Sequence, residues 1–473
     1  MTARRMRARN PLTGEFDFEF AAPGDDEIEA ATKRLRAAQP RWRGLGPEAR
    51  GAALIRFAQE IERRRTALFA ALSADTGRRA IAEHEIQGSL ALIRRWAEEA
   101  PRLLRESERP SAAHPNIAMR ETGEPFALVG AISPWNFPLL LSMIDAIPAL
   151  AAGCAVFIKP SEVTPRFVGP LMDAVAAATD VRDVLHVAAG DGAVGAALVP
   201  LVDCVAFTGS VPTGRKVAEA AARAFIPAFL ELGGKDPAIV LHGADLERAA
   251  TAILRASVVS TGQACQSLER VYVDARSFDE FTRLLVEKAK ATPLAFVPGG
   301  IIGPIIFSRQ ADVIAEHLRD AVDKGAVILC GGKIETHGGG RWIAPTVLTR
   351  VRHDMKVMTE ETFGPVIPVM PFATIEEAVA RANDSVYGLS AAVFGPTEAD
   401  AAAVAERLEA GAVSINDAGL TTVVFEAEKT GFKLSGLGPS RTGASGLTRF
   451  LRRKALLYNR GPVAPIEAFA ERD

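Results

Sequence analysis

One cysteine, Cys265, stands in a short stretch of small and uncharged residues, Gly262-Gln263-Ala264-Cys265-Gln266-Ser267. A free thiol has a pKa of about 8.5, so only a few per cent of it is the nucleophilic thiolate at neutral pH. A catalytic Cys265 would therefore need a base and an oxyanion-stabilising group from elsewhere in the chain. Alternatively, Cys265 is a small buried apolar residue, as most free cysteines are.

Two further stretches supply groups of those kinds. Glu231 precedes a pair of glycines in Glu231-Leu232-Gly233-Gly234-Lys235, and such small neighbours allow a carboxylate to move or a ligand to pass close. Asn136, in Pro134-Trp135-Asn136-Phe137-Pro138, carries an amide that can donate to a developing oxyanion. Each also has an ordinary structural explanation, Glu231 as a surface residue beside a turn and Asn136 as a turn-forming residue.

A third group of residues could hold a phosphorylated ligand. The stretch 207–214, Phe-Thr-Gly-Ser-Val-Pro-Thr-Gly, ends a predicted strand and begins a predicted helix, whose free N–H groups favour phosphate. It lacks the Gly-x-Gly-x-x-Gly and Gly-Lys-Ser/Thr patterns, so a plain tight turn is equally compatible with it. Lys159 and Glu162, just past another strand, could bracket two ribose hydroxyls, or form an exposed ion pair worth less than about 1 kcal/mol.

Together these groups are the parts for oxidising an aldehyde. The Cys265 thiolate would attack the carbonyl carbon, and Asn136 with a backbone N–H would hold the oxyanion. A nicotinamide would take the hydride, and Glu231 would activate the water that cleaves the resulting thioester.

The composition is that of a globular protein. The 473 residues are enough for two or three domains with a large core. Hydrophobic and charged contents of 48% and 24% are ordinary, and a net charge of −2 offers no cationic surface for nucleic acid or an anionic membrane. We therefore expect neither as a partner.

The cysteines and the termini limit the class further. Cysteines at 154, 204, 265 and 330 form no Cys-x-x-Cys pair, which argues against a zinc site and a disulfide framework and predicts no bound metal. The arginines of residues 1–10 are not followed by an apolar segment, and no stretch of about 20 uncharged apolar residues occurs. These features predict a cytoplasmic protein.

The elements that must position the chemistry alternate along the chain. Residues 25–105 are predicted to be helical, with amphipathic runs at 51–72 and 81–104. Strands alternating with helices then indicate a parallel sheet covered on both faces. The predicted strands are 127–132, 155–158, 184–187, 204–207 and 237–240, and the predicted helices are 139–152, 165–178 and 215–224.

Ligands bind such sheets at the carboxyl ends of the strands, and the candidate residues lie there: Asn136 after the first strand, Lys159 at the second, and Thr208 to Ser210 after the fourth. A second α/β domain is predicted from strands at 270–273, 326–329, 366–370, 391–394 and 413–416, with helices at 278–290, 311–324, 375–383 and 398–408. The basic segment 449–460 is predicted to be a strand edge or an oligomer contact.

Seven motifs, taken in order, resemble those of the aldehyde dehydrogenase superfamily over essentially the whole chain. They are Pro-Trp-Asn-Phe-Pro at 134–138, Lys-Pro-Ser-Glu at 159–162, Phe-Thr-Gly-Ser at 207–210, Glu-Leu-Gly-Gly-Lys at 231–235, Gly-Gln-x-Cys at 262–265, Glu-Thr-Phe-Gly-Pro at 361–365 and Asn-Asp-Ser-Val-Tyr-Gly-Leu at 383–389. The resemblance implies Cys265 as nucleophile, Glu231 as general base and Asn136 as oxyanion donor.

The resemblance also implies a cofactor site, with NAD favoured and NADP less so because the Glu162 carboxylate would repel a 2′-phosphate. Lys159 and Glu162 would hold the adenosine ribose, Ser210 the pyrophosphate and Glu361 the nicotinamide ribose, with Phe363 beside the nicotinamide ring. The full set is Ile132, Ser133, Trp135, Lys159, Ser161, Glu162, Gly192, Gly195, Phe207, Thr208, Gly209, Ser210, Thr213, Leu232, Gly233, Glu361 and Phe363.

The substrate tunnel implied by family position is uncharged, which predicts an apolar and bulky aldehyde rather than a carboxylate-bearing semialdehyde. Its expected lining is Phe137, Leu140, Leu141, Ile144, Ala264 and Gln266, with the stretch 420–424. The sequence departs from the family pattern at 428–436 and at Gly438-Pro439-Ser440-Arg441. An acidic residue that relays protons in some members is missing there.

The implied fold is α/β, with a Rossmann-type cofactor domain at 1–106 and 126–235, a catalytic domain at 236–448, and a small β oligomerisation segment at 107–125 and 449–473. Family members form homodimers or homotetramers, and we expect one of these. Two alternatives remain: a CoA-acylating aldehyde dehydrogenase, against which Glu231 argues, and a catalytically silent binding protein on the same fold.

Overall fold

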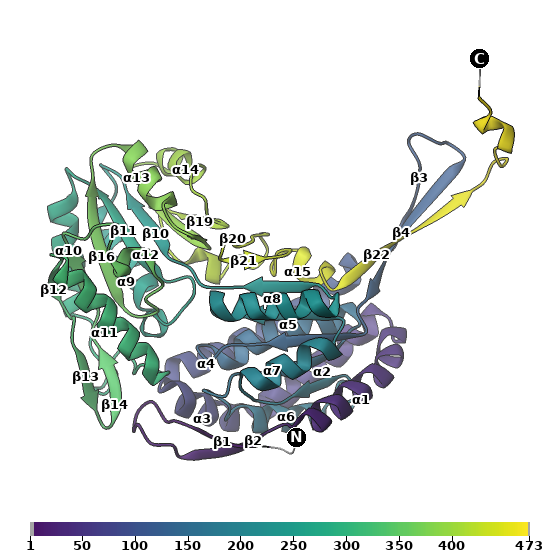
Figure 1. Ribbon diagram of the computed structural model, residues 1–473, viewed down its shortest axis with the longest axis horizontal. Coiled ribbons are helices and arrows are strands. Elements are labelled where there is room, and N and C mark those ends of the chain that lie inside the picture. The colour runs from purple at the N-terminus through teal and green to yellow at the C-terminus, as the bar shows by residue number, and fades with distance from the viewer. Residues whose placement is uncertain (1–3, 472–473) are drawn as a thin grey trace.

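Two sheets of mainly parallel strands form the body of the protein, and a narrow three-stranded arm projects from it (Figure 1). The computed structural model describes residues 4–471. Helices cover the sheets, so the α/β class expected from the sequence is confirmed.

The first sheet has the strand order β21-β9-β8-β5-β6-β7, in which only β21 is antiparallel to its neighbour. Helices α1, α5, α6 and α8 pack against its strands, and α2 and α4 pack on α5. The strands are β5 (Leu128–Ile132), β6 (Ala155–Lys159), β7 (Leu185–Val187), β8 (Cys204–Thr208), β9 (Ala228–Glu231) and β21 (Gly436–Leu437). The helices are α1 (Asp25–Gly44), α2 (Pro47–Arg63), α3 (Arg65–Thr76), α4 (Arg79–Leu103), α5 (Pro138–Ala152), α6 (Val168–Ala177), α7 (Gly192–Leu198) and α8 (Val211–Ala224).

Three sequence-based expectations for this part were incomplete or wrong. Strand β9 was not predicted, because its four residues run directly into Leu232-Gly233-Gly234. The strand at 237–240 does exist, but it lies in the second sheet rather than continuing the first. The helical run at 51–72 is divided between α2 and α3 at Arg64.

The second sheet has the order β12-β15-β16-β11-β10-β18-β19, with β12 antiparallel and the rest parallel. Alternate residues of β10 face opposite sides: Ala238 and Val240 join one buried cluster and Ile239 joins the other. The strands are β10 (Asp236–Val240), β11 (Leu268–Asp274), β12 (Val327–Cys330), β15 (Thr346–Thr349), β16 (Val366–Phe372), β18 (Ser390–Phe394) and β19 (Ala412–Ile415). The helices are α9 (Leu246–Val258), α10 (Phe278–Lys290), α11 (Ser308–Asp323), α12 (Lys356–Thr359), α13 (Ile375–Asn383) and α14 (Glu398–Ala405).

Short elements complete the body. They are β1 (Arg4–Ala8), β2 (Phe18–Ala22), β13 (Ile334–His337), β14 (Gly340–Ile343), β17 (Tyr387–Gly388), β20 (Phe432–Lys433), α15 (Ser445–Thr448), and the 3₁₀ turns η1 (Val199–Leu201), η2 (Val259–Gly262), η3 (Leu420–Thr422) and η4 (Ile466–Phe469). After β21 the chain runs beside the first sheet, where α15 packs on α5 and Phe450 joins the core. The domain limits given above remain a prediction.

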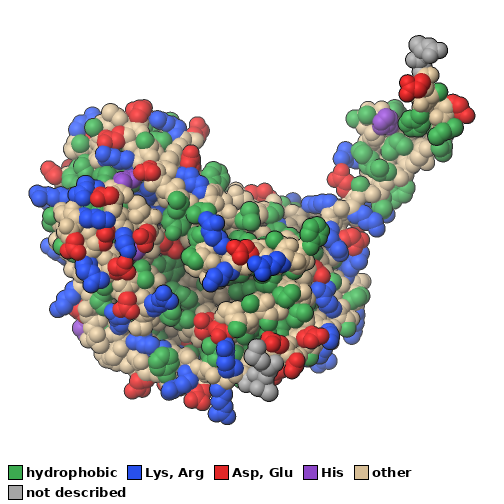
Figure 2. All heavy atoms as spheres, in the orientation of Figure 1, with side chains coloured by type: hydrophobic (Ala, Val, Ile, Leu, Met, Phe, Trp, Pro, Cys, Tyr) green, Lys and Arg blue, Asp and Glu red, His purple; other side chains and the backbone are tan. Residues whose placement is uncertain are grey.

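The arm consists of β3 (Glu108–Pro110), β4 (Ile117–Pro125) and β22 (Leu451–Asn459), paired in antiparallel register. Hydrophobic side chains gather along its visible face (Figure 2). Within residues 4–471, no helix is both long and apolar enough to cross a membrane.

Candidate active site

The loop that carries Cys265 has an unusual backbone. Ser260, Thr261 and Gly262 in η2 all have positive φ angles, of 49°, 63° and 71°. A Cβ on Gly262 would overlap the backbone of Gly364, so glycine is required there both for the left-handed conformation and for this close approach. The turn thereby fixes the direction in which Cys265 leaves it.

The buried side chain of Gln263 holds this loop in place. Its Nε2 donates to the carbonyl oxygens of Ser260 at 2.9 Å and Pro304 at 3.3 Å, and its Oε1 accepts from the backbone N–H of Ile306 at 2.9 Å. Gln263 also accepts through its own carbonyl oxygen, from Nδ2 of Asn136 at 2.9 Å. The candidate oxyanion donor is therefore bonded to the residue two before the thiol.

Asn136 lies between the end of β5 and the start of α5. Pro138 opens α5, as suits a residue with a fixed φ and no N–H. Behind it, the carboxylate of Glu85 accepts from the backbone N–H groups of Leu139 and Leu140, at 2.8 and 3.1 Å. Burial raises the pKa of Glu85 to about 8, although these two bonds favour its ionised form.

Glu231 is the last residue of β9, between two other strands. It pairs with Thr208 of β8 on one side and Gly436 of β21 on the other. Its carbonyl oxygen accepts from the N–H of Gly209 at 3.1 Å. The backbone of Glu231 is thus held on both sides, at the carboxyl edge of the first sheet where ligands bind.

Two cavities meet at these residues. One of about 210 Å³ lies toward β8 and α8, and one of about 370 Å³ lies toward α4 and α5. The residues that line both are Asn136, Leu141, Glu231, Leu232 and Cys265. The structure therefore brings the three candidate catalytic residues together where the cavities join.

The environment of Cys265 keeps its thiol protonated at rest. Burial raises the pKa of Cys265 to about 12, and the carboxylates of Glu361, Asp236 and Glu231 add to the effect while Arg441 opposes it. A catalytic role for Cys265 would therefore require a neighbouring base or cation that helps to form its thiolate.

The smaller cavity contains eight of the residues expected at the cofactor. They are Trp135, Thr208, Gly209, Ser210, Leu232, Gly233, Glu361 and Phe363. The rings of Trp135 and Phe363 meet edge to face, 5.4 Å between centroids. Glu361 is turned inward against Gly233, and its Oε1 accepts from the N–H of Gly234 at 3.2 Å. Burial, followed by the charge of Glu269, raises the pKa of Glu361 to about 8.

The other expected cofactor residues lie outside that cavity, farther along the strand ends. Lys159 Nζ donates to the carbonyl oxygen of Asp191 at 3.4 Å, and Ser161 Oγ donates to Glu162 Oε2 at 3.2 Å. The remaining expected cofactor residues follow the same edge. Ile132 ends β5, Phe207 lies in β8, and Gly192 and Gly195 lie in α7. Ser133 donates its N–H to the carbonyl oxygen of Lys159, and Thr213 Oγ1 accepts from Ser210 Oγ at 3.2 Å.

These residues fit an elongated dinucleotide. Ser210 precedes the fourteen-residue helix α8, and its side chain makes no capping bond to the backbone, so N–H groups of the first turn stay free for phosphate. The aromatic pair Trp135 and Phe363 lines the same cavity as Cys265, and it could pack against a planar ring bound there. Among residues 4–471, no three His, Cys, Asp or Glu side chains are clustered in a way that could hold a metal ion.

Comparison with known proteins now adds a decisive observation: the family model described as the aldehyde dehydrogenase family matches residues 1–456. The chain belongs to the aldehyde dehydrogenase family.

Similar aldehyde dehydrogenases are known from several bacteria. A Mycolicibacterium smegmatis protein, provisionally named a succinate-semialdehyde dehydrogenase (NADP(+)), is 36% identical over 441 residues, 92% of this chain and 85% of that one. The solved structure of a provisionally assigned Anabaena variabilis aldehyde dehydrogenase is 54% identical, covers 98% of this chain and 99% of its own, and has a TM-score of 0.96. Betaine aldehyde dehydrogenase of Staphylococcus aureus, solved with NAD+, is 30% identical with a TM-score of 0.92, covering 99% and 94%.

The larger cavity of this aldehyde dehydrogenase contains all six individually expected substrate residues: Phe137, Leu140, Leu141, Ile144, Ala264 and Gln266. From the stretch 420–424, Thr421 and Thr422 line it. The expectation of an uncharged lining is wrong, however, because Lys429 and Arg441 also face this cavity, with His84 of α4. Both cations come from the segment in which the sequence departs from the family pattern.

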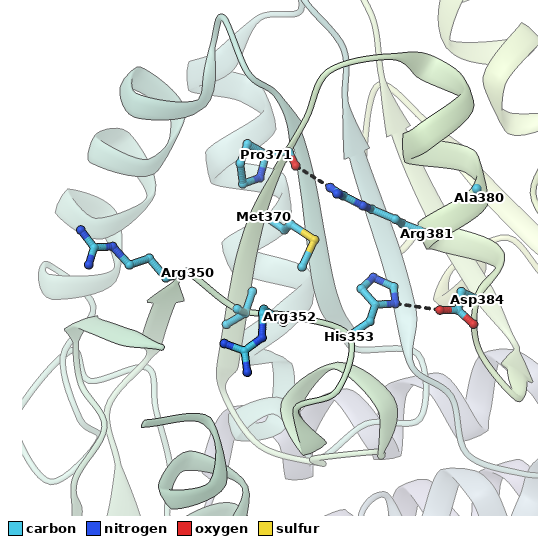
Figure 3. Close-up of a pocket in the computed structure, with 9 residues that line it drawn as sticks. Arg350, Arg352, His353, Met370, Pro371, Ala380, Arg381 and Asp384 are labelled. Carbon is cyan, nitrogen blue, oxygen red and sulfur yellow. Dashed lines mark hydrogen bonds and ion pairs between the residues drawn. The ribbon is translucent and has the colours of Figure 1, made fainter. Parts of the chain in front are cut away.

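A hollow of about 730 Å³ lies elsewhere, on the second sheet (Figure 3). Its lining is basic but largely self-paired: Arg381 donates to the carbonyl oxygen of Pro371 at 2.7 Å, and His353 Nδ1 lies 3.0 Å from Asp384 Oδ2. Neither Cys265 nor Glu231 lines it, so this hollow has no part in the chemistry of the site.

Proposed function

We propose that this aldehyde dehydrogenase oxidises its aldehyde to the free carboxylic acid, with NAD as cofactor and with hydrolysis of a thioester on Cys265. The observation that carries the proposal is the meeting of Cys265, Glu231 and Asn136 where the two cavities join. The smaller cavity supplies the cofactor side and the larger one the substrate side.

Each residue has a role that its contacts support. One N–H of the Asn136 amide donates to Gln263, which orients the second N–H toward the oxyanion that forms when Cys265 Sγ bonds to the carbonyl carbon. Bound NAD supplies the hydride acceptor. Glu231 then takes a proton from water as its oxygen attacks the thioester, and the C–S bond breaks to free the acid and the thiolate.

The direct test is the absorbance of NADH when aldehyde and NAD are added, with and without CoA. Hydrolytic turnover should proceed without CoA, whereas a strict need for CoA would support the acylating alternative. Cys265→Ala should abolish turnover while NAD still binds, measured by quenching of tryptophan fluorescence. Cys330→Ala is the matched control, since Cys330 is also half-buried but lines neither cavity. Near-normal turnover by Cys265→Ala would refute the proposal.

We infer a preference for NAD over NADP from Glu162. Its carboxylate would accept hydrogen bonds from ribose hydroxyls but lie beside a 2′-phosphate, and one like charge at about 4 Å is costly even at an effective dielectric of about 20. Steady-state kinetics should favour NAD by about tenfold to a hundredfold in kcat/KM, and Glu162→Ser should narrow the gap. Equal efficiency in the parent enzyme would contradict the inference.

The substrate is proposed to have an apolar body. Phe137, Leu140 and Ile144 line the larger cavity, and the charges of Lys429 and Arg441 are engaged within the protein, Lys429 with the carbonyl oxygen of Thr421 and Arg441 with Asp145. A carboxylate-bearing semialdehyde is the second candidate, because these same two cations face the cavity. Comparing kcat/KM for benzaldehyde, a medium-chain alkanal and succinic semialdehyde decides between them, and the highest value for the semialdehyde would refute the apolar assignment.

The arm is proposed to join copies of the chain into a dimer or tetramer. Leu457 and, beyond the strand, Val463, Ile466 and Phe469 are 67–84% exposed in the single chain. Apolar surface of this extent favours burial against a partner. Sedimentation analysis should show an oligomer that Leu457→Asp weakens, whereas a monomeric parent protein would contradict the proposal.

A further inference from the structure

Arg441 has a buried N–H group that no described residue, from 4 to 471, satisfies with a hydrogen bond. Its Nε makes no hydrogen bond, although the residue lines the substrate cavity beside Cys265. Oε1 of Glu231 lies 3.9 Å from this Nε. This distance is too long for a hydrogen bond but short enough for an attraction between opposite charges.

The rest of the Arg441 guanidinium is firmly anchored. Its Nη2 donates to Asp145 Oδ2 at 2.8 Å and to Thr208 Oγ1. Asp145 lies in α5 and is also paired with Arg449, whose guanidinium stacks over Phe450 at 4.9 Å. Burial alone would raise the pKa of Asp145, but the two guanidiniums outweigh it and hold that pKa below its usual range. Asp145 therefore stays ionised and fixes the direction of Arg441.

Chain topology brings this cation to the base. Arg441 follows β21, which pairs with β9 so that Gly436 lies opposite Glu231. Asp145 approaches from α5, the helix that begins just after Asn136. The base, the cation and its anchor thus come from three separate segments; Glu231 and Arg441 line the cavity, and Asp145 does not.

We propose that Arg441 is the positioning residue for Glu231, placing a permanent positive charge beside its carboxylate and directing that carboxylate at the acyl group on Cys265. The inference rests on the proposed hydrolytic function. In the step concerned, water forms a C–O bond to the thioester carbon, its proton passes to Glu231 and the C–S bond breaks. Arg441 does not carry that proton, because a guanidinium stays protonated in proteins. Its part is to hold a fixed positive charge beside the carboxylate, and the proton taken up by Glu231 returns to solvent before the next turnover.

Other charged groups near Glu231 do not offer the same contact. Lys429 lines the same wall, but it donates to the carbonyl oxygen of Thr421, and burial lowers its pKa to about 8. His84 and Cys265 face the cavity, and Glu361 lies across Gly233. Arg449 lies behind Asp145 and does not line the cavity. Arg441 is the permanently charged donor among the cavity-lining residues.

The test follows hydrolysis of acetyl-Cys265 formed from p-nitrophenyl acetate, which acylates a thiol without aldehyde or cofactor. Deacylation rates are measured from about pH 5 to about pH 9 for the parent and Arg441→Met. In the plot of deacylation rate against pH, the acid limb is the part where the rate falls as the pH is lowered. Without the guanidinium, this acid limb should move at least about one pH unit toward alkaline pH, as expected when a carboxylate loses an adjacent positive charge. Arg441→Lys should recover most of the shift, and Arg449→Lys should leave the limb near its parent position.

A double-mutant cycle separates positioning from a general structural effect. In a Glu231→Gln background, Arg441→Met should cause no further slowing, because no carboxylate remains to be held. If Arg441→Met fails to fold, Arg441→Gln removes the positive charge while its amide can still donate to Asp145, and it should give the same alkaline shift. An unmoved acid limb, or equal slowing with and without Glu231, overturns the proposal. A parent enzyme that hydrolyses the acetyl group but oxidises no aldehyde would instead refute the proposed function alone.

Discussion

Asn136 donates from Nδ2 to the backbone carbonyl oxygen of Gln263 at 2.9 Å. Asn136 follows β5 of the first sheet, and Gln263 follows α9 and precedes β11 of the second. This bond ties the proposed oxyanion donor directly to the loop of Cys265, the proposed nucleophile, across the two halves of the body. The geometry of the site thus depends on how the two sheets are held together.

The first prediction concerns the Asn136→Ala variant, which lacks the hydrogen bond to Gln263. We expect kcat to fall about 100- to 1,000-fold, because the substitution removes an oxyanion donor and frees the carbonyl oxygen of Gln263. Asn136→Asp should be as poor, since a carboxylate cannot donate. Steady-state kinetics measure the effect, and Asn383→Ala, outside both cavities, is the control. A loss smaller than about tenfold would show that the amide is not the donor.

Glu231→Gln should separate the two chemical stages. The amide cannot accept a proton from water, so deacylation slows while formation of the acyl group on Cys265 continues. Rapid-mixing absorbance should show a burst of NADH close to one per active site, followed by a stall. Loss of the burst together with the steady rate would mean that Glu231 acts before the acyl group forms.

Gly262→Ala should disrupt the nucleophile loop. The residue has a φ of 71°, and a Cβ there would overlap Gly364, so the variant should lose activity and melt at a lower temperature. Gly169→Ala in α6 is the matched control, because nothing lies within 4 Å of a Cβ at that position. The control should keep its Tm or raise it slightly, as helical Ala does over Gly. Parallel thermal scans and activity assays make the comparison.

We expect the buried carboxyl group of Glu85 to make the stability of the folded protein depend on pH. Its pKa is raised to about 8 in the folded protein, against about 4.3 in an unfolded chain, so the folded state binds the proton more tightly. The stabilising effect of this proton is full below the unfolded pKa and is lost as pH rises through about 8. Glu85→Gln mimics the protonated form and should gain in Tm relative to the parent between about pH 5 and pH 9.

The matched control for this comparison is Glu98→Gln, an exposed carboxylate on the same helix. A difference in Tm between Glu85→Gln and the parent that stays constant with pH would contradict the titration of Glu85.

Local patterns were enough to predict some elements to the residue. Helices α10 and α13 match their predicted ranges, because their apolar spacing is regular and Thr374 caps α13 by accepting from the N–H of Glu377 at 3.2 Å. Strand β9 could not be predicted in this way. Its four residues form a strand because β8 and β21 pair with it, and β21 lies some two hundred residues later in the sequence.

The same limit applies to the site. Motif order placed Cys265, Glu231 and Asn136 in one reaction scheme, and the structure brings these residues together. Sequence reasoning did not predict that Lys429 and Arg441 line the larger cavity. Their placement depends on the chain coming back to the first sheet, where β21 pairs with β9. The signal that could have pointed to it was the Gly438-Pro439-Ser440-Arg441 departure itself, which lacks the acidic residue of the family pattern and contains Arg441.

The pairing of β21 with β9 also has a consequence for biosynthesis. The strand that ends in Glu231 has an open edge until Gly436 and Leu437 have left the ribosome, and the first core lacks Leu447 and Phe450 until slightly later. An unpaired edge and an incomplete core are the features of a growing chain that attract aggregation and chaperones. The side of the site formed by β9 and β21 can therefore form only after residue 437 has been made, so a chain terminated before β21 is expected to be inactive even though it already contains Cys265, Glu231 and Asn136.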